Sequence, residues 1–262
     1  MPAKSPSKML REERRRAILQ ILEREQRVTV QDLVKRFGVT AVTIRADLDS
    51  LARMGALERS HGGAVTRWDR LMDFPITIKE GLHHAEKVRI ARAAVELIRS
   101  EQTILLDSGT TTAQIARQLK GRRSKLTVIT NALNIAYELA SAPDITVIML
   151  GGLLRPASFS MVGPQAEHAL SRLAADHLFL GVDGIDPEAG LFTPDILEAK
   201  LNAIMVNVSR EVTVVADSSK FGRRGLSLIA EIGAVNRLIT DRDAPREAVQ
   251  QLRSAGVEVV LV

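Results

Sequence analysis

A run of small polar residues, Asp107-Ser108-Gly109-Thr110-Thr111, directly precedes a predicted helix. Hydroxyl groups, a glycine and free amide groups at a helix N-terminus suit a phosphate, because the helix dipole also attracts an anion. Lys220 follows a later predicted strand and would add a positive charge. Aspartates at the same edge could accept hydrogen bonds from sugar hydroxyls. The chemistry that these residues favour is the binding of a phosphorylated sugar.

Similar residues follow other predicted strands. Thr130-Asn131 ends one strand, Gly151-Gly152 follows the next, and Asp183 and Asp241 follow later ones. Any one of these residues could simply form a loop or a helix cap. Their recurrence at successive strand ends favours one shared polar pocket, because ligands of open α/β sheets bind at the carboxyl ends of the strands.

An enzyme remains an alternative to a binding site. Asp183 and Asp186 with Lys200 and Lys220 could transfer protons, but the sequence places no dedicated acid and base pair. The segment 107–110 also matches the active-site turn of aspartic proteases, which need two facing carboxylates on a mostly β scaffold. Gly-rich nucleotide motifs are missing, and adjacent His83-His84 would make a poor metal clamp. We expect no catalytic residue, no cofactor and no metal.

The elements that must position these residues alternate between strands and helices. Short apolar runs predict strands at 103–106, 126–130, 145–150, 177–180, 212–216, 237–240 and 257–260. Helical patterns lie at 86–99, 112–119, 132–140, 164–173, 196–208 and 246–254. Nearly all-apolar strands are typical of a parallel sheet with both faces covered. Residues 83–262 therefore predict a doubly wound α/β domain.

The first quarter of the chain has a different pattern. Helices are predicted over 9–25, 30–37 and 41–54, with Thr29 and Thr40 as caps and Gly38 and Gly55 as ends. A tight turn between the second and third helices is the helix-turn-helix arrangement, which places the third helix in the major groove. Residues 57–65 predict a β-hairpin, or wing, with a Gly62-Gly63 turn. A plain helical bundle is the alternative.

Charge supports the DNA-binding interpretation. The 262-residue chain has a net charge of +5, and residues 1–70 carry 15 Lys or Arg against 9 Asp or Glu. Neutralisation of phosphates by such residues supplies much of DNA affinity. Arg45 could read guanine or grip a phosphate, and Arg59 and His61 could reach a neighbouring phosphate. Cysteine is absent, which suits a reducing cytoplasm, and no run reaches the length of a membrane span.

We expect a DNA-binding domain at 1–66, a connector at 67–82, and a sensor and oligomerisation domain at 83–262. The connector has no clear period and contains Pro75 and Gly81. Its Trp68 and Phe74 should pack against one of the domains.

At this point the residues resemble a known family. Segment 39–48 followed by 57–64 resembles the winged helix-turn-helix signature of the DeoR family of bacterial sugar-catabolism repressors. Thr40 stands where the family usually has Ser, and Ala46 where it usually has Arg or Lys, so one contact to DNA could differ. The resemblance gives these candidate DNA-binding residues: Thr40, Ala41, Thr43, Arg45, Ala46, Arg59 and His61.

The resemblance extends over the second domain, through 107–111, 130–131, 151–152, 181–184, 198–200, 217–221 and 240–241. It implies a sensor similar in fold to ribose-5-phosphate isomerase and glucosamine-6-phosphate deaminase. Segments 74–87 and 151–156 resemble the subgroup that represses N-acetylgalactosamine catabolism genes. The candidate effector-binding residues are Asp107, Ser108, Gly109, Thr110, Thr111, Thr130, Asn131, Gly151, Gly152, Asp183, Lys200 and Lys220.

The resemblance implies a transcriptional regulator whose partners are duplex operator DNA and a small phosphorylated sugar such as a hexose or an amino sugar. We expect a homo-oligomeric repressor of carbohydrate or amino-sugar catabolism genes that the effector releases from its operator. An activator with the same sensor, or an isomerase-like enzyme, is the alternative. Effector binding can shift DNA affinity only if it favours the arrangement that cannot bind DNA.

Overall fold

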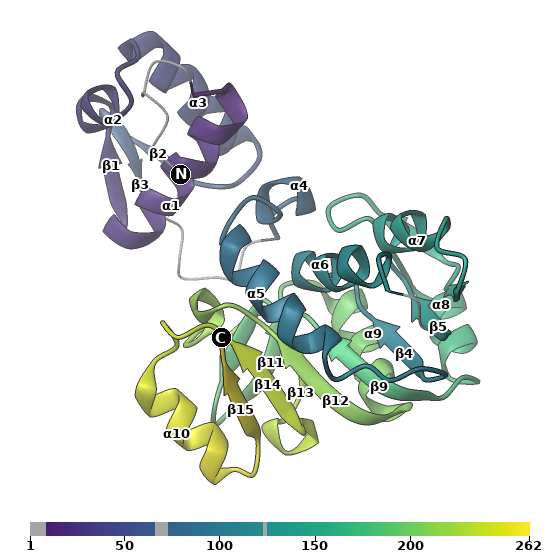
Figure 1. The fold of residues 1–262 in the computed structure, drawn as a ribbon. Coiled ribbons are helices and arrows are strands. Elements are labelled where there is room, and N and C mark those ends of the chain that lie inside the picture. The colour runs from purple at the N-terminus through teal and green to yellow at the C-terminus, as the bar shows by residue number, and fades with distance from the viewer. Residues whose placement is uncertain (1–8, 66–72, 123–124) are drawn as a thin grey trace. The chain divides into compact units, whose positions relative to one another are not determined.

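The computed structural model describes residues 9–65, 73–122 and 125–262 and separates into two units, Met1–Leu82 and His83–Val262 (Figure 1). The first unit contains α1 (Arg11–Glu25), β1 (Arg27–Thr29), α2 (Val30–Phe37), α3 (Ala41–Arg53), β2 (Glu58–Ser60), β3 (Gly63–Val65) and α4 (Ile76–Lys79). The predicted three helices and the wing are therefore confirmed, with α1 and α3 slightly shorter than expected.

The local signals of the helix-turn-helix act as predicted. The Thr29 hydroxyl accepts a hydrogen bond from the Asp32 amide, and the Thr40 hydroxyl accepts one from the Thr43 amide. Gly38 ends α2 with a φ of 63°, which costs glycine little. Ile44 and Leu48 of α3 are fully buried in the core of the unit.

The strand β1 was not predicted, because three residues carry no strand signal of their own. Its partner β3 makes it a strand, in an antiparallel sheet of order β1-β3-β2. Gly63 permits this pairing. A Cβ at Gly63 would lie 2.0 Å from the Val28 carbonyl oxygen, so no other residue fits without moving the strand.

Part of the predicted connector is folded. Ile78 of α4 is buried in the core of the first unit, and Phe74 and Leu82 pack against that core. The C-terminal part of segment 67–82 is thus a component of the first unit. Phe74 packs as expected, while Trp68 lies outside the described residues.

The second unit is built on a parallel sheet of seven strands in the order β15-β14-β12-β9-β4-β5-β6. The strands are β4 (Thr103–Leu106), β5 (Leu126–Thr130), β6 (Ile145–Met149), β9 (Ala175–Leu180), β12 (Ser209–Val215), β14 (Arg237–Thr240) and β15 (Glu258–Leu261). All seven coincide with predicted strands to within three residues at each end.

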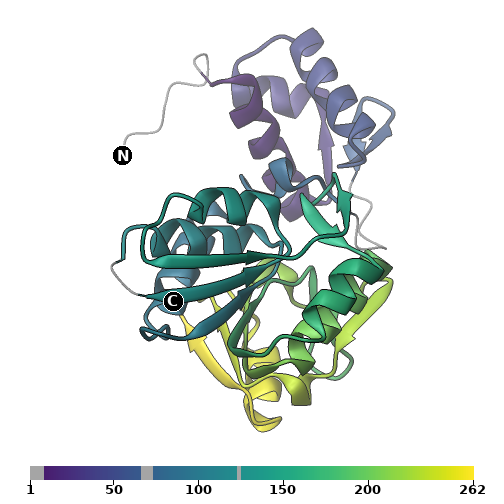
Figure 2. The ribbon, with the colours of Figure 1, turned by 90° about the vertical axis from the view of Figure 1, so that its right-hand side faces the viewer.

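Helices cover both faces of this sheet (Figure 2). One face packs against α5 (His84–Val95), α6 (Thr110–Leu119) and α7 (Leu133–Leu139), and the other against α8 (Pro164–Leu170), α9 (Ile196–Asn207) and α10 (Arg246–Ser254). Side chains of a strand alternate between the faces, so Leu105 joins one core while Ile104 and Leu106 join the other. The predicted doubly wound α/β fold is confirmed.

Two smaller sheets were not predicted. The hairpin of β7 (Leu153–Arg155) and β8 (Ser160–Val162) follows the edge strand β6, and a three-stranded sheet pairs β10 (Gly184–Asp186), β11 (Gly190–Thr193) and β13 (Ser227–Ala230). His177 of β9 is buried. Its Nε2 lies 2.7 Å from the Thr213 hydroxyl, and burial lowers its pKa. Among the described residues, no helix is long and apolar enough to cross a membrane.

Candidate effector site and nucleic-acid interface

The strand order places a switch point at β4 and β9. From β4 the chain adds β5 and β6 on one side, and then returns to place β9 on the other side of β4. Crossover connections diverge at such a point and leave a crevice at the carboxyl ends of the two strands. Asp107 follows β4 and Gly181 follows β9, so both lie at this crevice.

Asp107 is buried at the bottom of the site, with 4% of its surface exposed. Gly181 makes room for it, because a Cβ at Gly181 would lie 3.3 Å from Asp107 Oδ2. The Gly109 amide donates a hydrogen bond of 3.2 Å to Oδ1, and the Thr112 hydroxyl donates one of 3.1 Å to the backbone carbonyl. Burial raises the pKa of Asp107 to about 7, against the lowering effect of its hydrogen bonds to Gly181, Thr112 and Gly109. This carboxyl can therefore be neutral near physiological pH.

The start of α6 offers backbone donors beside Asp107. Gly109 is the N-cap residue, and no side chain caps the helix. Ser108 and Thr110 are half-buried and Thr111 is buried. An uncapped N-terminus of a helix of this length is a favourable place for an anion.

Asn131 follows β5, the neighbour of β4. It is 1% exposed, and its Nδ2 donates a hydrogen bond of 3.1 Å to the Met161 carbonyl oxygen. Its Oδ1 is buried and accepts no hydrogen bond within the described structure. Thr130, in contrast, uses its hydroxyl to accept a hydrogen bond from the Ala132 amide. Because buried polar atoms are normally paired, Asn131 Oδ1 is a strong candidate for a ligand contact.

A second group of charges follows β9 and β12. Lys220 Nζ lies 4.0 Å from Asp183 Oδ1, so these two predicted residues do come together. Burial would raise the pKa of Asp217, but Lys220, Lys87, His83 and the Ser219 hydroxyl lower it below its usual value. Oδ2 of Asp217 accepts no hydrogen bond from the described residues.

Asp241 serves the neighbouring loop. Its Oδ2 accepts a hydrogen bond of 2.7 Å from the Ser218 amide, and its Oδ1 accepts one of 3.1 Å from the Asp243 amide. The edge from β4 to β14 thus carries buried carboxylates that the chain partly neutralises with lysines.

Three predicted effector residues have other surroundings. Lys200 of α9 is 62% exposed, and its ammonium lies 2.6 Å from Glu167 of α8. Gly152 has a φ of 137°, and a Cβ there would lie 2.6 Å from the Val162 carbonyl oxygen, so this glycine is needed for the chain to enter the β7–β8 hairpin. Gly151 is exposed and a Cβ there would meet nothing within 4 Å.

Arg155 and Glu198 were not among the candidate effector-binding residues, although both lie in segments that carry the family resemblance. Glu198 is 8% exposed, and its Oε1 accepts hydrogen bonds from Arg155 at 3.1 Å and from Ser160 at 3.0 Å. Its charge is close enough to raise the pKa of Asp107. Asp195 caps α9 through the Glu198 amide, and the segment 198–200 of the family resemblance is the signal that could have selected Glu198.

The exposed face of α3 carries the candidate DNA contacts. Arg45 and Ala46 are exposed, as expected. The hydroxyls of Thr40 and Thr43 lie 3.0 Å apart and take part in the cap of α3. Val42 was not predicted, yet it is 72% exposed, three residues before Arg45 on the same helical face. An apolar side chain at this place suits the methyl group of thymine.

The two candidate residues of the wing, Arg59 and His61, differ in their contacts within the unit. Arg59 is bound within the unit, because its Nε lies 2.9 Å from Asp49 of α3 and its Nη1 donates a hydrogen bond of 2.6 Å to the Gly63 carbonyl oxygen. Arg59 therefore fastens the wing to α3. His61 is exposed at the tip of the wing.

Comparisons with known proteins show the family to which both units of the chain belong. Residues 14–67 match the DeoR-like helix-turn-helix domain, and residues 82–242 match the DeoR C terminal sensor domain. The chain is 41% identical over 252 residues, 95% of this chain and 93% of the relative, to a "putative aga operon transcriptional repressor" of Escherichia coli O157:H7. It is 31% identical to the glycerol-3-phosphate regulon repressor of Escherichia coli K12, across 97% of this chain and 100% of the relative.

Among solved structures, a ribose 5-phosphate isomerase A from Methanocaldococcus jannaschii is similar, with 20% identity and a TM-score of 0.39. The similarity covers 53% of this chain and 55% of the isomerase.

Proposed function

The chain belongs to the DeoR family of DNA-binding transcriptional regulators, and from this membership we propose that a phosphorylated sugar binds at the carboxyl edge of its parallel sheet and releases the chain from operator DNA. It is a regulator and not an enzyme, because the family model of its second unit is a sensor domain and its relatives are named as repressors. A chain that binds operator DNA acts where the chromosome is, so we place it in the cytoplasm.

The observation that carries the effector proposal is the buried, unpaired Oδ1 of Asn131 at the strand end beside Asp107. The uncapped start of α6 supplies amide donors for a phosphate. A protonated Asp107 carries no charge that would repel the phosphate, and its carboxyl hydrogen can be donated in a hydrogen bond. Lys220 adds a positive charge, and Asp183 can accept a hydrogen bond from a hydroxyl group. The name of the glycerol-3-phosphate regulon repressor favours glycerol 3-phosphate as one candidate effector, and the family resemblance of segments 74–87 and 151–156 favours a phosphorylated amino sugar as another.

A route from this site to the rest of the sensor leads through the β7–β8 hairpin. Asn131 bonds to Met161 of β8 in both directions, through its side chain and through its carbonyl oxygen. Ser160, the neighbouring residue, bonds to Glu198, which Arg155 of β7 also contacts. A ligand contact that shifts Asn131 would therefore shift the β7–β8 hairpin, which is joined to the start of α9 through Glu198.

The operator interface consists of α3 and the wing. Arg45 and Val42 supply base contacts in the major groove, and His61 reaches the neighbouring phosphates. A helix-turn-helix protein matches two half-sites one helical turn apart, so the chain acts as a homo-oligomer of at least two copies. Analytical ultracentrifugation of the full chain should give a dimer or tetramer; a monomer at concentrations that bind the operator would contradict this.

A ligand screen tests the effector proposal. The operator is selected from a random duplex pool with the purified full chain, and the chain is then titrated with hexose 6-phosphates, amino-sugar phosphates, pentose phosphates and glycerol 3-phosphate. We expect at least one to raise the melting temperature and to displace the operator, and its unphosphorylated sugar to do neither. The proposal would be contradicted if an unphosphorylated sugar displaced the operator equally well. It would also be contradicted if none of the compounds bound to the chain.

A further inference from the structure

A cavity beside α10 and the edge strand β15 has three arginines in its lining. It has a volume of about 630 Å³, and its lining residues are Arg242, Ala244, Arg246, Val249, Gln250, Arg253 and Leu261. It lies between α10 and the edge strand β15, whereas the effector site follows β4, β9 and β12. Cavities of this size hold small organic molecules.

The charges in this cavity are not balanced. No carboxylate belongs to its lining. Two other arginines of the unit are paired with carboxylates: Arg237 Nη2 lies 2.7 Å from Glu258, and Arg224 Nε lies 2.7 Å from Asp186. Within the described part of the chain, neither Arg242 nor Arg246 has a carboxylate within ion-pair distance. Like charges around one hollow repel each other, and a bound anion would relieve that repulsion.

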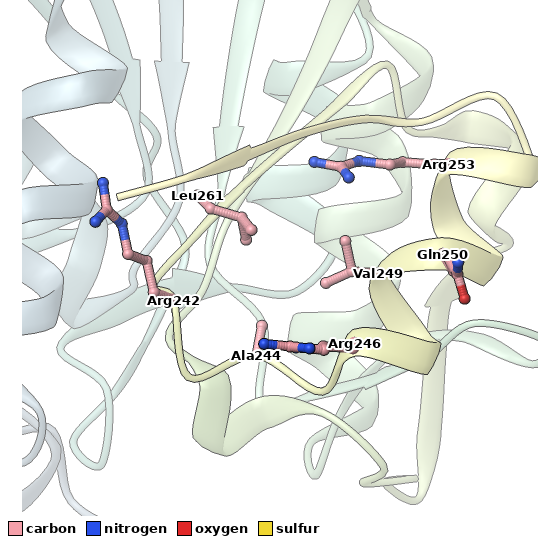
Figure 3. Close-up of a pocket in the computed structure, with 7 residues that line it drawn as sticks. All are labelled: Arg242, Ala244, Arg246, Val249, Gln250, Arg253 and Leu261. Atoms are coloured by element: carbon pink, nitrogen blue, oxygen red, sulfur yellow. The ribbon is translucent and has the colours of Figure 1, made fainter.

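The arrangement of the side chains suits a small anion with a short apolar body. Figure 3 shows Arg253 extending from α10 toward the strand that carries Leu261 and Arg246 extending toward Ala244, with Val249 between them, Gln250 pointing away and Arg242 on the far side of Leu261. Arg253 is held in place, because its Nη2 donates a hydrogen bond of 3.1 Å to the Val259 carbonyl oxygen. A guanidinium fixed in this way still offers donors, and its planar fork matches two oxygens of a carboxylate or a phosphate. Val249, Ala244 and Leu261 provide the apolar wall.

We propose that this cavity is a second ligand site, which binds a small organic oxyanion through Arg246 and Arg253 and packs its hydrocarbon part on Val249 and Leu261. The shared chemistry is two or more anionic oxygens on a compact carbon body, as in a dicarboxylate or tricarboxylate or in a phosphate monoester. None of its lining residues is a candidate effector-binding residue, although Arg242 directly follows Asp241 of the carboxyl edge.

Calorimetric titration of the full chain with citrate and, separately, with phenyl phosphate tests the proposal. We expect at least one of these anions to bind, with an affinity that falls as the salt concentration rises. The double substitution Arg246→Gln with Arg253→Gln should weaken that binding at least tenfold. The single change Arg246→Lys, which keeps the charge but loses the fork, should have a smaller effect. The matched control is Lys220→Ala in the effector pocket, which should leave the affinity for this anion within twofold.

The outcomes are distinct. Binding that survives the double substitution, or binding that Lys220→Ala removes, would overturn the second site, the latter because the anion would then occupy the effector pocket. Failure of both anions to bind would also overturn it. This holds even if substitution of the arginines changes the affinity for DNA or the oligomeric state. The melting temperature of each variant shows that it is folded. Failure of the sugar-phosphate screen would leave this site unaffected.

Discussion

The carboxylate of Asp47, on the buried side of α3, accepts a hydrogen bond of 2.6 Å from Nε of Arg14 in α1. Arg15 adds a second contact of 3.1 Å to the other carboxylate oxygen. Asp47 is 1% exposed and Arg14 is 7% exposed, so this ion pair is shielded from water. The helix that carries the DNA contacts is therefore held in its orientation by charge as well as by the apolar residues Ile44 and Leu48.

We expect Asp47→Ala to lower the free energy of unfolding of the first unit by about 3 kcal/mol, because loss of one partner leaves a buried guanidinium uncompensated. Hydrogen exchange of the α1 and α3 amides measures this. Asp49→Ala is the matched control: Asp49 is 57% exposed and pairs with Arg59, and such surface pairs contribute at most about 1 kcal/mol. An equal loss of unfolding free energy in the two variants would show that the buried Asp47 pair stabilises the unit no more than a surface pair.

Arg45→Ala should abolish binding to the operator while the fold is retained, because Arg45 is exposed on the face of α3 that enters the groove. Gel shifts at controlled salt concentration, with operator and unrelated duplex side by side, measure the specific part of the affinity. Arg53→Ala, at the last turn of the same helix, is the control and should reduce affinity for both duplexes alike, if at all. Specific affinity that persists in Arg45→Ala would remove Arg45 from the interface.

Lys220→Ala should weaken effector binding at least tenfold and leave operator binding intact, because Lys220 brings positive charge to Asp183 and Asp217 at the effector edge. Calorimetry with the sugar phosphate found by the screen gives the affinity. Lys120→Ala, at the opposite end of α6 and paired with Glu138, is the control. Lys200→Ala should also have little effect, since its ammonium is bound to Glu167. An unchanged affinity in Lys220→Ala would contradict the pocket.

The buried carboxyl of Asp107 should make stability depend on pH. Its pKa is about 7 in the folded chain and near 4 in the unfolded one. Between these values the folded chain binds a proton that the unfolded chain lacks, so stability falls as the pH rises from about 4 to 7. The total change is at most about 4 kcal/mol. Denaturant titrations of wild type and Asp107→Asn at several pH values isolate this effect, because the substitution removes it; parallel profiles of the two proteins would contradict the assignment.

Glu198→Gln should separate effector binding from operator release. The change keeps a hydrogen-bond acceptor for Ser160 but removes the charge that holds Arg155. We expect the effector to bind within a few-fold of its normal affinity, while the concentration needed to release the operator rises. Calorimetry and gel shifts on the same preparation give the two numbers. A proportional loss of both would mean that Glu198 acts on binding alone and that the hairpin carries no signal.

The main elements could be predicted because their signals are local. Thr40 caps α3 and Gly38 ends α2 through contacts within a few residues, and the β4 and β5 segments are apolar throughout because both faces of the sheet are covered. The strand β1 could not be predicted, since only its pairing with Gly63 makes it a strand. The β7–β8 hairpin was missed for a similar reason, as its exposed Leu153 and Leu154 lack the alternating pattern of a half-buried strand.

The site was predicted to the same extent. Asp107 and Asn131 follow β4 and β5 directly, Lys220 lies in the segment after β12, and the edge rule for parallel sheets brings such residues to one edge. Glu198 and Arg155 reach the edge through a helix start and a hairpin, and their meeting depends on long-range packing that no short spacing reveals. The partner of Lys200 likewise lies on another helix, so its ion pair with Glu167 could not be foreseen.

The structure tolerates substitution very differently at Gly63 and at His61 of the wing. The base of the wing tolerates no side chain, because Gly63 lies against the Val28 carbonyl oxygen. The tip at His61 is exposed, and no side-chain crowding limits what stands there. Exchanges and short insertions at the tip are therefore compatible with the fold, whereas any amino-acid exchange at Gly63 would separate β3 from β1 and deform the wing.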